Sequence, residues 1–543
     1  MLLNIITKDI CFDKNKKNMY HKFSLENTDY YWTGVFFIRG MKSGAESVKK
    51  LAESFQYNGV NALDFENFMG AFTFIIKENN GRCILFTDNS NQRGFYISDN
   101  FVSESFIELL HTDKGLTLSK EAVCEYLVYG QTFFLKTLVN GITISDSKKY
   151  YIVDGDSIES SDKKIANIDG KPEDNSLNEL YRDIAYGISN LKVSLALTGG
   201  FDSRMVLVLL KDGVKIDTCI SGDNIEDKDI IISQRVAEAC GLKHEIEKIP
   251  KPDITEEYLY KSFIDRDAPA LGYGSGDLRI YEMLKNRKAK KYDIHMTGDS
   301  GIYYKDEDWL QEFPLYNKKK FSIEKFYRQR IRCAKCTIPF SETFAAAAKK
   351  NEERILNTLN EEKRQTNTKS FDWYSWNIKN SSGRKKHLMS SSAEIDLYCP
   401  MLELKSVRFS YNLPRRKRFK GNVMKAAITK ADQNVAKIPT LTGETTSYKL
   451  NYRFYDVFMY AKSFCVRALR YFCRIAFKKR CFDNDVLTWD CSEEVRNSDT
   501  AKKAFEFAVN QGIINCRFNE VNFDLLSKLI NLYFINREIV KGN

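Results

Sequence analysis

The sequence predicts an α/β protein: an α+β N-terminal domain of layered β-sheets, followed by a parallel-sheet domain with a helical C-terminal extension. Three observations predict this. Residues 1–155 contain short runs of β-branched and aromatic residues, which are typical of strands. From residue 181, strand-like and helix-like segments alternate, as they do in a parallel sheet with helices on its faces. Beyond about residue 310 the chain becomes mainly helical and more basic.

Local signals place the elements of the first 155 residues. Asn80-Gly81 lies between "FTFIIKEN" and "RCILFTD" and is the strongest short-range signal for a β-hairpin. "SKEAVCEYLVYG" indicates a helix that interrupts the strands, with Ser119 as N-cap and Gly130 at its end. Residues 156–180 are polar and show no clear period, so we interpret them as a linker.

The alternation that follows defines a second domain, residues 181–445. Its predicted order is strand, helix, strand, helix, strand, in the segments "VSLALT", "DSRMVLVLLKDG", "VKIDTCIS", "KDIIISQRVAEACG" and "KHEIEKI". Residues 446–543 are interpreted as a helical C-terminal extension. Within it, residues 452–480 interleave aromatic and basic side chains. This segment either packs on the second domain as an ordinary helix, or contacts an anionic membrane surface or an acidic partner.

Composition restricts the class of protein. Hydrophobic residues make up 43% of the 543 residues and charged residues 29%, as in soluble globular proteins. The net charge of +11 is spread along the chain, so nucleic acid is not predicted as a partner. The thirteen cysteines are scattered, and Cys333 and Cys336 form one CxxC without a second pair at zinc-site spacing. With no signal peptide or long apolar run, we expect a cytoplasmic protein.

A two-glycine turn, "LTGGFDSR" at 197–204, separates two apolar runs. Glycines let the backbone approach a ligand, and the helix that follows presents unpaired N–H groups and the positive end of its dipole. These features predict an anion site, most naturally for phosphate, where Asp202 could hold magnesium and Ser203 could donate a hydrogen bond. The alternative is a tight strand-to-helix turn with Asp202 as N-cap. The pattern is neither the Walker loop nor GxGxxG.

The turn resembles the SGGxDS pyrophosphate loop of the N-type ATP pyrophosphatases, with Thr198 in place of the usual serine. Other segments resemble, in the same order along the chain, the asparagine synthetase family, including its class II glutamine amidotransferase domain. Together they cover roughly residues 65–445. They are "GAFTFIIKENNGRCILFTDNSNQRGFYIS" (70–98), "SKEAVCEYLVYGQTFFLKTLVNGI" (119–142), "SGDNIEDKDIIISQRVAEACGLKHE" (221–245), "MTGDSGIYY" (296–304) and "EIDLYCPMLELKSVRFSYNLPRRKRFKGNVMKAAI" (394–428).

The resemblance implies the residues of an ATP site, with ATP and Mg²⁺ as cofactors. Asp202 is the implied metal ligand, and Asp299 falls at the family's catalytic glutamate. The implied ATP-binding residues are Leu197, Thr198, Gly199, Gly200, Asp202, Ser203, Ser221, Thr297 and Gly298.

The sequence departs from the family at three places. Leu2 stands where the family has its nucleophilic cysteine, and Cys11 has no free amine beside it, so glutamine hydrolysis is not expected. Ile302 stands where an aspartate would help Asp202 hold magnesium. The family's RxK near residue 440 is absent; Lys425 is our candidate replacement and Lys449 a second one, each of them alternatively a solvated side chain.

The resemblance implies an ATP-dependent, AMP-forming amide ligase, as in asparagine synthetase. It would activate a small-molecule carboxylate as an acyl-adenylate for attack by ammonia or an amine. Three alternatives stay open: a ring-closing ligase like the β-lactam synthetases and lasso-peptide cyclases, an enzyme that amidates sugar carboxylates of polysaccharides, and an inactive ATP-binding scaffold. The acid, the nitrogen donor and the oligomeric state are not specified by the sequence.

Overall fold

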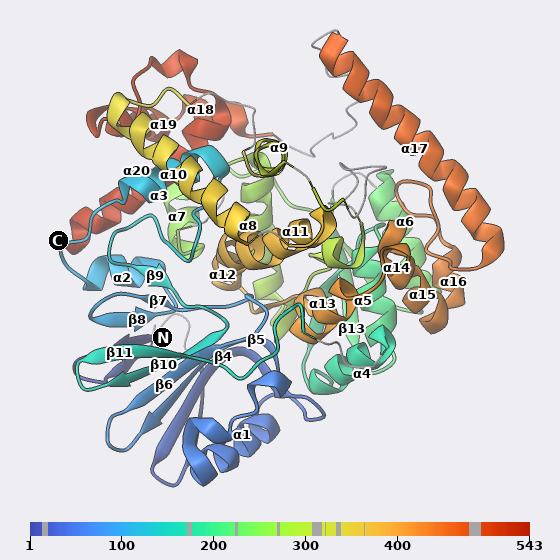
Figure 1. Ribbon diagram of the computed structural model, residues 1–543, viewed down its shortest axis with the longest axis horizontal. Helices are drawn as coiled ribbons and strands as arrows, with labels where there is room; N and C mark the ends of the chain where they lie inside the picture. The colour runs from blue at the N-terminus through green and yellow to red at the C-terminus, as the bar shows by residue number, and fades with distance from the viewer. Residues whose placement is uncertain are drawn as a thin grey trace.

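The computed structural model describes residues 1–12, 20–170, 176–222, 226–268, 272–306, 318–320, 322–332, 338–362, 364–476 and 490–543. Two antiparallel sheets form one end of the molecule, and a parallel sheet with its helices forms the other (Figure 1). The α/β class predicted from the sequence is confirmed.

The N-terminal part contains a six-stranded and a five-stranded antiparallel sheet. The first has the order β11 (Ser157–Asp162), β10 (Lys149–Asp154), β6 (Cys83–Thr87), β5 (Phe68–Glu78), β4 (Thr28–Ile38) and β3 (Tyr20–Leu25). The second has the order β2 (Ile10–Cys11), β1 (Leu2–Asn4), β8 (Phe101–Ser103), β7 (Tyr96–Ile97) and β9 (Thr143–Ile144). Leu3, Ile75 and Leu85 are buried in one cluster between the two sheets.

Two local predictions are confirmed here. Strands β5 and β6 pair as a hairpin around Asn80-Gly81, and Gly81 has φ +88°, a conformation that glycine adopts without strain. Helix α3 (Lys120–Tyr129) begins after Ser119, whose side chain accepts a hydrogen bond from the Ala122 amide, and ends at Gly130 in the left-handed conformation.

The start of the predicted linker is a strand. Residues 157–162 form β11, which pairs with β10 over six residues. The Asp154–Gly155–Asp156 turn that reverses the chain is a turn signal, but β11 is mostly exposed and polar. An edge strand pairs with a single neighbouring strand. When its side chains are also exposed, as in β11, it lacks the alternation of apolar and polar residues by which a strand is recognised in a sequence.

The second part is built on a five-stranded sheet in which every pair is parallel. Its order is β14 (His244–Glu247), β13 (Ile216–Ser221), β12 (Val193–Ala196), β15 (Ile294–Met296) and β16 (Leu397–Tyr398). The chain proceeds from β12 to one side and later resumes at β15 on the other side. This is a topological switch point, and in open α/β sheets ligands bind outside the carboxyl ends of the strands at such a point.

Helices surround these sheets. They are α1 (Ala45–Asn58), α2 (Phe106–Thr112), α4 (Leu177–Gly187), α5 (Asp202–Leu210), α6 (Lys228–Ala239), α7 (Glu256–Asp265), α8 (Ser275–Ala289), α9 (Ile323–Phe326), α10 (Glu342–Glu361), α11 (Asn367–Tyr374), α12 (Lys385–Ser392), α13 (Leu404–Tyr411), α14 (Arg415–Arg418), α15 (Asn422–Ala431), α16 (Gln433–Lys437), α17 (Leu450–Ala476), α18 (Ser492–Asn497), α19 (Asp499–Asn510) and α20 (Phe523–Gly542).

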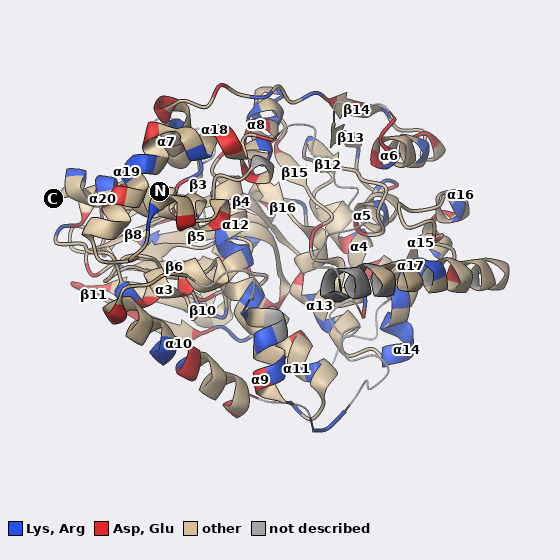
Figure 2. Cartoon of the chain, turned by 90° about the horizontal axis from the view of Figure 1, so that it is seen from above, with Lys and Arg blue, Asp and Glu red and all other residues tan. Residues whose placement is uncertain are grey.

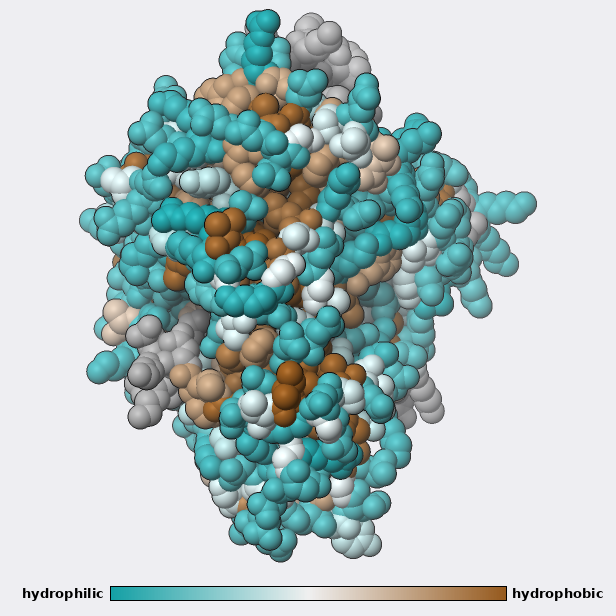
Figure 3. Space-filling model, turned by 90° about the vertical axis from the view of Figure 1, so that its left-hand side faces the viewer, coloured by the Kyte–Doolittle hydropathy of each residue, from teal (hydrophilic) through white to brown (hydrophobic). Residues whose placement is uncertain are grey.

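The end of the chain returns to the N-terminal part. Helix α20 packs on α2, where His111 Nε2 lies 2.7 Å from Glu538 Oε2 and the Lys114 ammonium donates to the Gly542 carbonyl (Figure 1). Figure 3 shows the left-hand side of the view in Figure 1. Hydrophilic residues cover most of this face, and hydrophobic residues show mainly along a central band. The extension therefore completes a hydrophobic core with α2 and α3.

Buried polar contacts join the two parts. The Gly70 amide of β5 donates to Glu403 Oε1 at 2.8 Å, and the Tyr398 hydroxyl donates to the same oxygen at 2.8 Å. Arg93 forms an ion pair with Asp396. Burial raises the pKa of Glu403 to about 8, although the hydrogen bonds from Gly70 and Tyr398 oppose the shift. Around neutral pH this carboxyl group is therefore mainly protonated.

We expect Glu403→Gln to remove part of the pH dependence of stability. Because the pKa of Glu403 is raised in the folded chain, the folded state keeps a proton that the unfolded state loses above its ordinary pKa. Unfolding should therefore become easier as pH rises towards 8. The neutral glutamine should raise the free energy of unfolding at pH 8 by ~1 kcal/mol or more, with no gain at pH 4. Thermal unfolding at several pH values measures this. Glu159→Gln, at an exposed position of β11, is the control; parallel curves for the wild type and Glu403→Gln would contradict the expectation.

Candidate functional site

Two loops meet at the switch point of the parallel sheet. Residues 197–201 follow β12 and residues 297–300 follow β15, at the carboxyl ends of adjacent strands. A Cβ on Gly298 would lie 2.4 Å from the Ser203 backbone nitrogen, and a Cβ on Gly301 would lie 2.2 Å from the Asp202 carboxylate. Real Cβ atoms do not approach other atoms this closely. The atoms facing Gly298 are backbone atoms, so the contact between the loops requires glycine there, whereas at Gly301 the Asp202 side chain would have to move.

The loop after β12 is ordered by its own hydrogen bonds. The Thr198 amide donates to Ser203 Oγ at 3.0 Å, the Gly200 amide donates to Thr198 Oγ1 at 3.4 Å, and the Gly199 amide donates to Asp229. Helix α5 begins at Asp202 without a side-chain cap, so Asp202 is not the N-cap that the alternative interpretation required. The loop contains two glycines and leads directly into the N-terminus of α5. A helix N-terminus after a glycine turn is the arrangement expected of an anion site.

Arg204 connects this loop to the segment near residue 440 by hydrogen bonds. Its side chain is fully buried, and Nη2 donates to the Gly199 carbonyl and to the Pro439 carbonyl, each at 3.3 Å. Burial lowers the pKa of Arg204 to about 10, which leaves the guanidinium charged at neutral pH. The segment near residue 440, where the family's RxK is missing, is therefore tied to the loop by an arginine of α5.

Lys305 supplies a positive charge that sequence reasoning missed. Its ammonium lies 2.5 Å from Asp202 Oδ1. Lys305 directly follows the 3₁₀ helix η4 (Gly301–Tyr304), one turn after Ile302, at which an aspartate was expected. Lys305 lies three residues after Ile302, which is one turn of a 3₁₀ helix, and this spacing is the local signal that could have indicated Lys305. A lysine thus reaches the carboxylate that, from the sequence, was expected to bind magnesium.

The residues present fit a magnesium ion held mainly by phosphate oxygens. Among the described residues, no group of three or more His, Cys, Asp or Glu side chains converges as a metal site. Asp202 can contribute one carboxylate beside the loop, and magnesium in nucleotide sites commonly has one or two carboxylate ligands plus phosphate oxygens. Cys333 and Cys336 lie outside the described residues.

A cavity of about 170 Å³ opens beside Asp202. One wall is η7 (Ser375–Arg384), a π-helix, a geometry often found at functional sites. It brings Lys379 and Arg384 to the cavity, and Arg384 Nη1 lies 4.0 Å from Asp299 Oδ1. Asn380 Oδ1 and the Ser300 hydroxyl also line the cavity, and both are buried without a hydrogen-bond partner in the described part of the chain. Ser300 has φ +77°, an uncommon conformation for a non-glycine residue. The two cations and the Ser300 hydroxyl, which can donate a hydrogen bond, suit an anionic ligand, whereas Asn380 Oδ1 can only accept one.

The structure places the other predicted residues around this centre. Asp299 is half-exposed, and the buried Cys399 thiol donates to its carbonyl oxygen at 3.0 Å. Thr297 Oγ1 lies 3.4 Å from Asp299 Oδ2. Ser221 ends β13, where its carbonyl accepts a hydrogen bond from Arg279 at 2.8 Å. Leu197 is buried, and its amide donates to the Cys219 carbonyl at 2.8 Å.

The two candidate lysines occupy different environments. Lys425 is 5% exposed, and its ammonium lies 2.5 Å from Asp456 Oδ2 and 5.5 Å from the centre of the Phe201 ring. Lys449 donates to Gln433 Oε1 at 2.7 Å at the surface. Phe201 directly precedes Asp202, so Lys425 contacts the last residue of the loop. Its positive charge is paired with Asp456 of α17. A catalytic role for Lys425 stays a prediction, as does that of Asp299.

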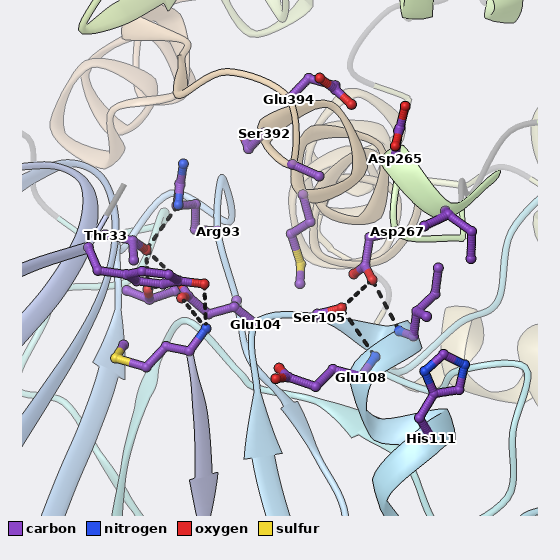
Figure 4. A pocket seen from close by; sticks show the side chains of 18 of the residues that line it. Thr33, Arg93, Glu104, Ser105, Glu108, His111, Asp265, Asp267, Ser392 and Glu394 are labelled. Atoms are coloured by element: carbon purple, nitrogen blue, oxygen red, sulfur yellow. Dashed lines mark hydrogen bonds and ion pairs between the residues drawn. The ribbon is translucent and has the colours of Figure 1, made fainter. Parts of the chain in front are cut away.

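A second cavity, of about 390 Å³, lies between the N-terminal sheets and the second part (Figure 4). Five carboxylates line it, those of Glu104, Glu108, Asp265, Asp267 and Glu394. Its cations are Arg93, Lys288 and the Met1 ammonium, which lies 3.3 Å from Glu104 Oε2, and His111 also lines it. The Ser392 hydroxyl is buried in its wall without a hydrogen-bond partner among the described residues. The excess of carboxylates favours a cationic ligand such as an amine in its protonated form.

Two further findings bear on the class of protein. No helix among the described residues is long and apolar enough to cross a membrane. Nine cysteines are free thiols: Cys11, Cys83, Cys124, Cys219, Cys240, Cys399, Cys465, Cys491 and Cys516.

Comparison with protein families assigns the second part of the chain. Residues 187–439 match the family model for asparagine synthase. This range includes β12, both loops, η7, Lys305 and Lys425. No curated protein matches the chain.

Proposed function

We propose that this chain, which belongs to the asparagine synthase family through residues 187–439, uses ATP to activate a small carboxylate and join it to an amine or ammonia. One observation carries the proposal. Asp202, which directly follows the two-glycine loop and pairs with Lys305, lines the same cavity as Lys379 and Arg384 of η7. A site for a triphosphate and an acid needs this combination of backbone N–H groups, a metal-binding carboxylate and fixed cations.

The proposed reaction has two steps. A carboxylate oxygen of the acid attacks the α-phosphorus of ATP, the bond to the β-phosphate oxygen breaks, and pyrophosphate leaves. An uncharged amine then attacks the acyl carbon, AMP leaves with the bonding electron pair, and the amine nitrogen loses a proton. The products are an amide, AMP, pyrophosphate and a proton.

Charge on the departing pyrophosphate is the main demand on the site. The N-terminus of α5 and the Lys305 ammonium stabilise that charge in our proposal. Magnesium bound by ATP phosphates, with Asp202 as its protein ligand, would neutralise further phosphate charge. Asp299, which lies 4.0 Å from Arg384 of the cavity wall, accepts the proton released by the attacking amine.

The second cavity supports an amine as the nitrogen donor. An alkylammonium ion or ammonium matches its carboxylates, whereas a neutral amide gains less from them. Lys288 lines this cavity and lies 3.2 Å from Glu394 Oε2. We place the waiting donor here, protonated, before it loses a proton and reacts.

A pyrophosphate-release screen tests the proposed function. Purified protein is incubated with ATP, magnesium and pairs of small carboxylic acids with ammonia, primary amines or glutamine, and products are identified by mass spectrometry. We expect AMP and pyrophosphate in equal amounts with at least one acid–amine pair. A product lighter than a single substrate by one water would indicate a ring-closing ligase instead. ATP binding without pyrophosphate release from any pair would indicate an inactive scaffold.

Arg384→Ala should raise the KM for the acid substrate. The guanidinium is one of two cations in the cavity beside Asp202, and losing a charge-assisted hydrogen bond typically weakens binding by ~10- to 100-fold. The KM for ATP should change much less. Steady-state kinetics with each substrate varied separately measures the split. Arg235→Ala, at an exposed position of α6, is the control. Equal effects on both KM values would contradict the assignment of Arg384 to the acid.

A further inference from the structure

Helix α17 is the longest helix described, and most of it lies away from the body of the protein. It covers 27 residues, Leu450–Ala476, and extends outwards from α15 and α16 (Figures 1 and 2). Its first turns are anchored by Asp456, which pairs with Lys425 and accepts a hydrogen bond from the Thr445 amide at 2.8 Å. The helix is therefore held firmly at one end and presents the rest of its length to the surroundings.

Five exposed apolar side chains of α17 form one stripe. Leu450, Phe454, Val457, Phe458 and Phe464 follow helical spacings of three, four and seven residues, which place them on one face. Phe454 is 74% exposed and Phe458 is 66% exposed. Large aromatic side chains with this exposure are normally covered by another surface, because a contiguous apolar patch in water is unfavourable.

The charges of α17 indicate what covers the stripe. The helix sequence contains five basic residues and one acidic residue, Asp456. Asp456 is buried against Lys425, so its charge is already neutralised within the body. Lys462 is exposed beside the stripe. The charges that remain are all positive, and an anionic surface complements them.

We propose that α17 lies on the surface of an anionic lipid bilayer, with its apolar stripe inserted at the level of the headgroups and Lys462 beside lipid phosphates. A second copy of α17 is a poorer occupant because it would bring two sets of positive charge together. A helix with these two faces is expected to lie in the plane of the membrane, and no described helix is able to cross it. The surface is independent of the ATP site, so vesicle binding tests it without any enzyme activity.

Flotation with lipid vesicles tests the proposal on the full chain. Vesicles contain either phosphatidylcholine alone or phosphatidylcholine mixed with phosphatidylserine. We expect the protein to float with the anionic vesicles at low salt, to bind them less at high salt, and to bind phosphatidylcholine vesicles weakly. Equal binding to both compositions, or no binding to the anionic vesicles, would overturn the proposal.

Variants identify the helix as the contact. The double variant Phe454→Ser/Phe458→Ser should lower the affinity for anionic vesicles at least ~10-fold, because two large apolar side chains no longer leave water on binding. Lys462→Glu should weaken binding and reduce its salt dependence. Tyr57→Ser removes an exposed aromatic residue of α1 and should bind as the wild type does.

Two further measurements distinguish lipid binding by the stripe from misfolding of the variant and from self-association. Unchanged circular dichroism and thermal unfolding show that the double variant is folded; undiminished vesicle binding by that folded variant would contradict the role of the stripe. Sedimentation velocity reports self-association. A wild-type dimer that the double variant abolishes, together with absence of vesicle binding, would assign the stripe to a second copy and overturn the membrane proposal.

Discussion

Asp202→Asn is expected to lower the kcat for pyrophosphate release by ~1,000-fold or more, since removing a principal charge-stabilising group from a phosphoryl-transfer site costs several kcal/mol. The substitution keeps the size of the side chain and its place between Gly301 and Lys305. It removes the carboxylate that is the protein's candidate ligand for magnesium. Binding of ATP measured without turnover should weaken much less, because the α5 N-terminus and the Lys305 ammonium remain.

The control for this variant is Asp212→Asn. Asp212 lies just beyond the other end of α5, its side chain is 82% exposed, and it forms a surface ion pair with Lys211. Such pairs contribute little to stability, so activity and unfolding temperature should be close to those of the wild type. Full turnover by Asp202→Asn would remove Asp202 from the site and with it the proposed metal ligand. A variant that loses ATP binding and unfolds early would instead indicate a structural role, which thermal unfolding distinguishes.

Gly298→Ala is expected to reduce turnover at least ~100-fold, because small displacements of reacting groups have effects of this size. The new Cβ would lie 2.4 Å from the Ser203 nitrogen and 2.6 Å from its Cα. Both are backbone atoms at the start of α5, so no side chain can rotate to make room. The loop 297–300 must separate from the 197–201 loop, which moves Asp299 and Ser300 away from Asp202.

Stability measurements accompany this variant. Overpacking at a rigid contact typically costs ~1–3 kcal/mol, so the unfolding temperature should fall while the chain still folds. Gly276→Ala is the matched control: no atom lies within 4 Å of its added Cβ, and it stands in the first turn of α8. Alanine there should be neutral or stabilise by up to ~1 kcal/mol. If Gly298→Ala retained wild-type activity, the two loops would not form one site.

Much of the second part was predictable because its signals are local. The apolar strands β12 and β13, the helix α6 ended by Gly241 and the two-glycine turn each follow from neighbouring residues. The Asn80-Gly81 hairpin and the capped helix α3 in the first part have the same origin. In each case the side chain that specifies the conformation lies within four residues of the backbone that adopts it.

The partners within the site were not predictable in this way. Arg384 reaches the cavity from η7, far along the chain from Asp202, and the π-helical turns that orient it have no simple residue pattern. Lys425 was proposed as a replacement for the lysine of the family's missing RxK, but its ion pair with Asp456 depends on how α17 packs on α15. The strand β11 and the packing of α20 on α2 likewise depend on surfaces that form only in the folded chain.

The sequence by itself determined the α/β class, the order of strands and helices around residues 193–249, and the two-glycine turn within 197–204, since backbone conformation there follows from nearby glycines, caps and apolar runs. Only the tertiary structure decided that Lys305 pairs with Asp202 and that Lys379 and Arg384 of η7 line the same cavity as Asp202. It also decided that the apolar face of α17 is exposed. The physical reason is that charge pairing and burial depend on distance in space, which residues far apart in the chain acquire only when the whole fold closes.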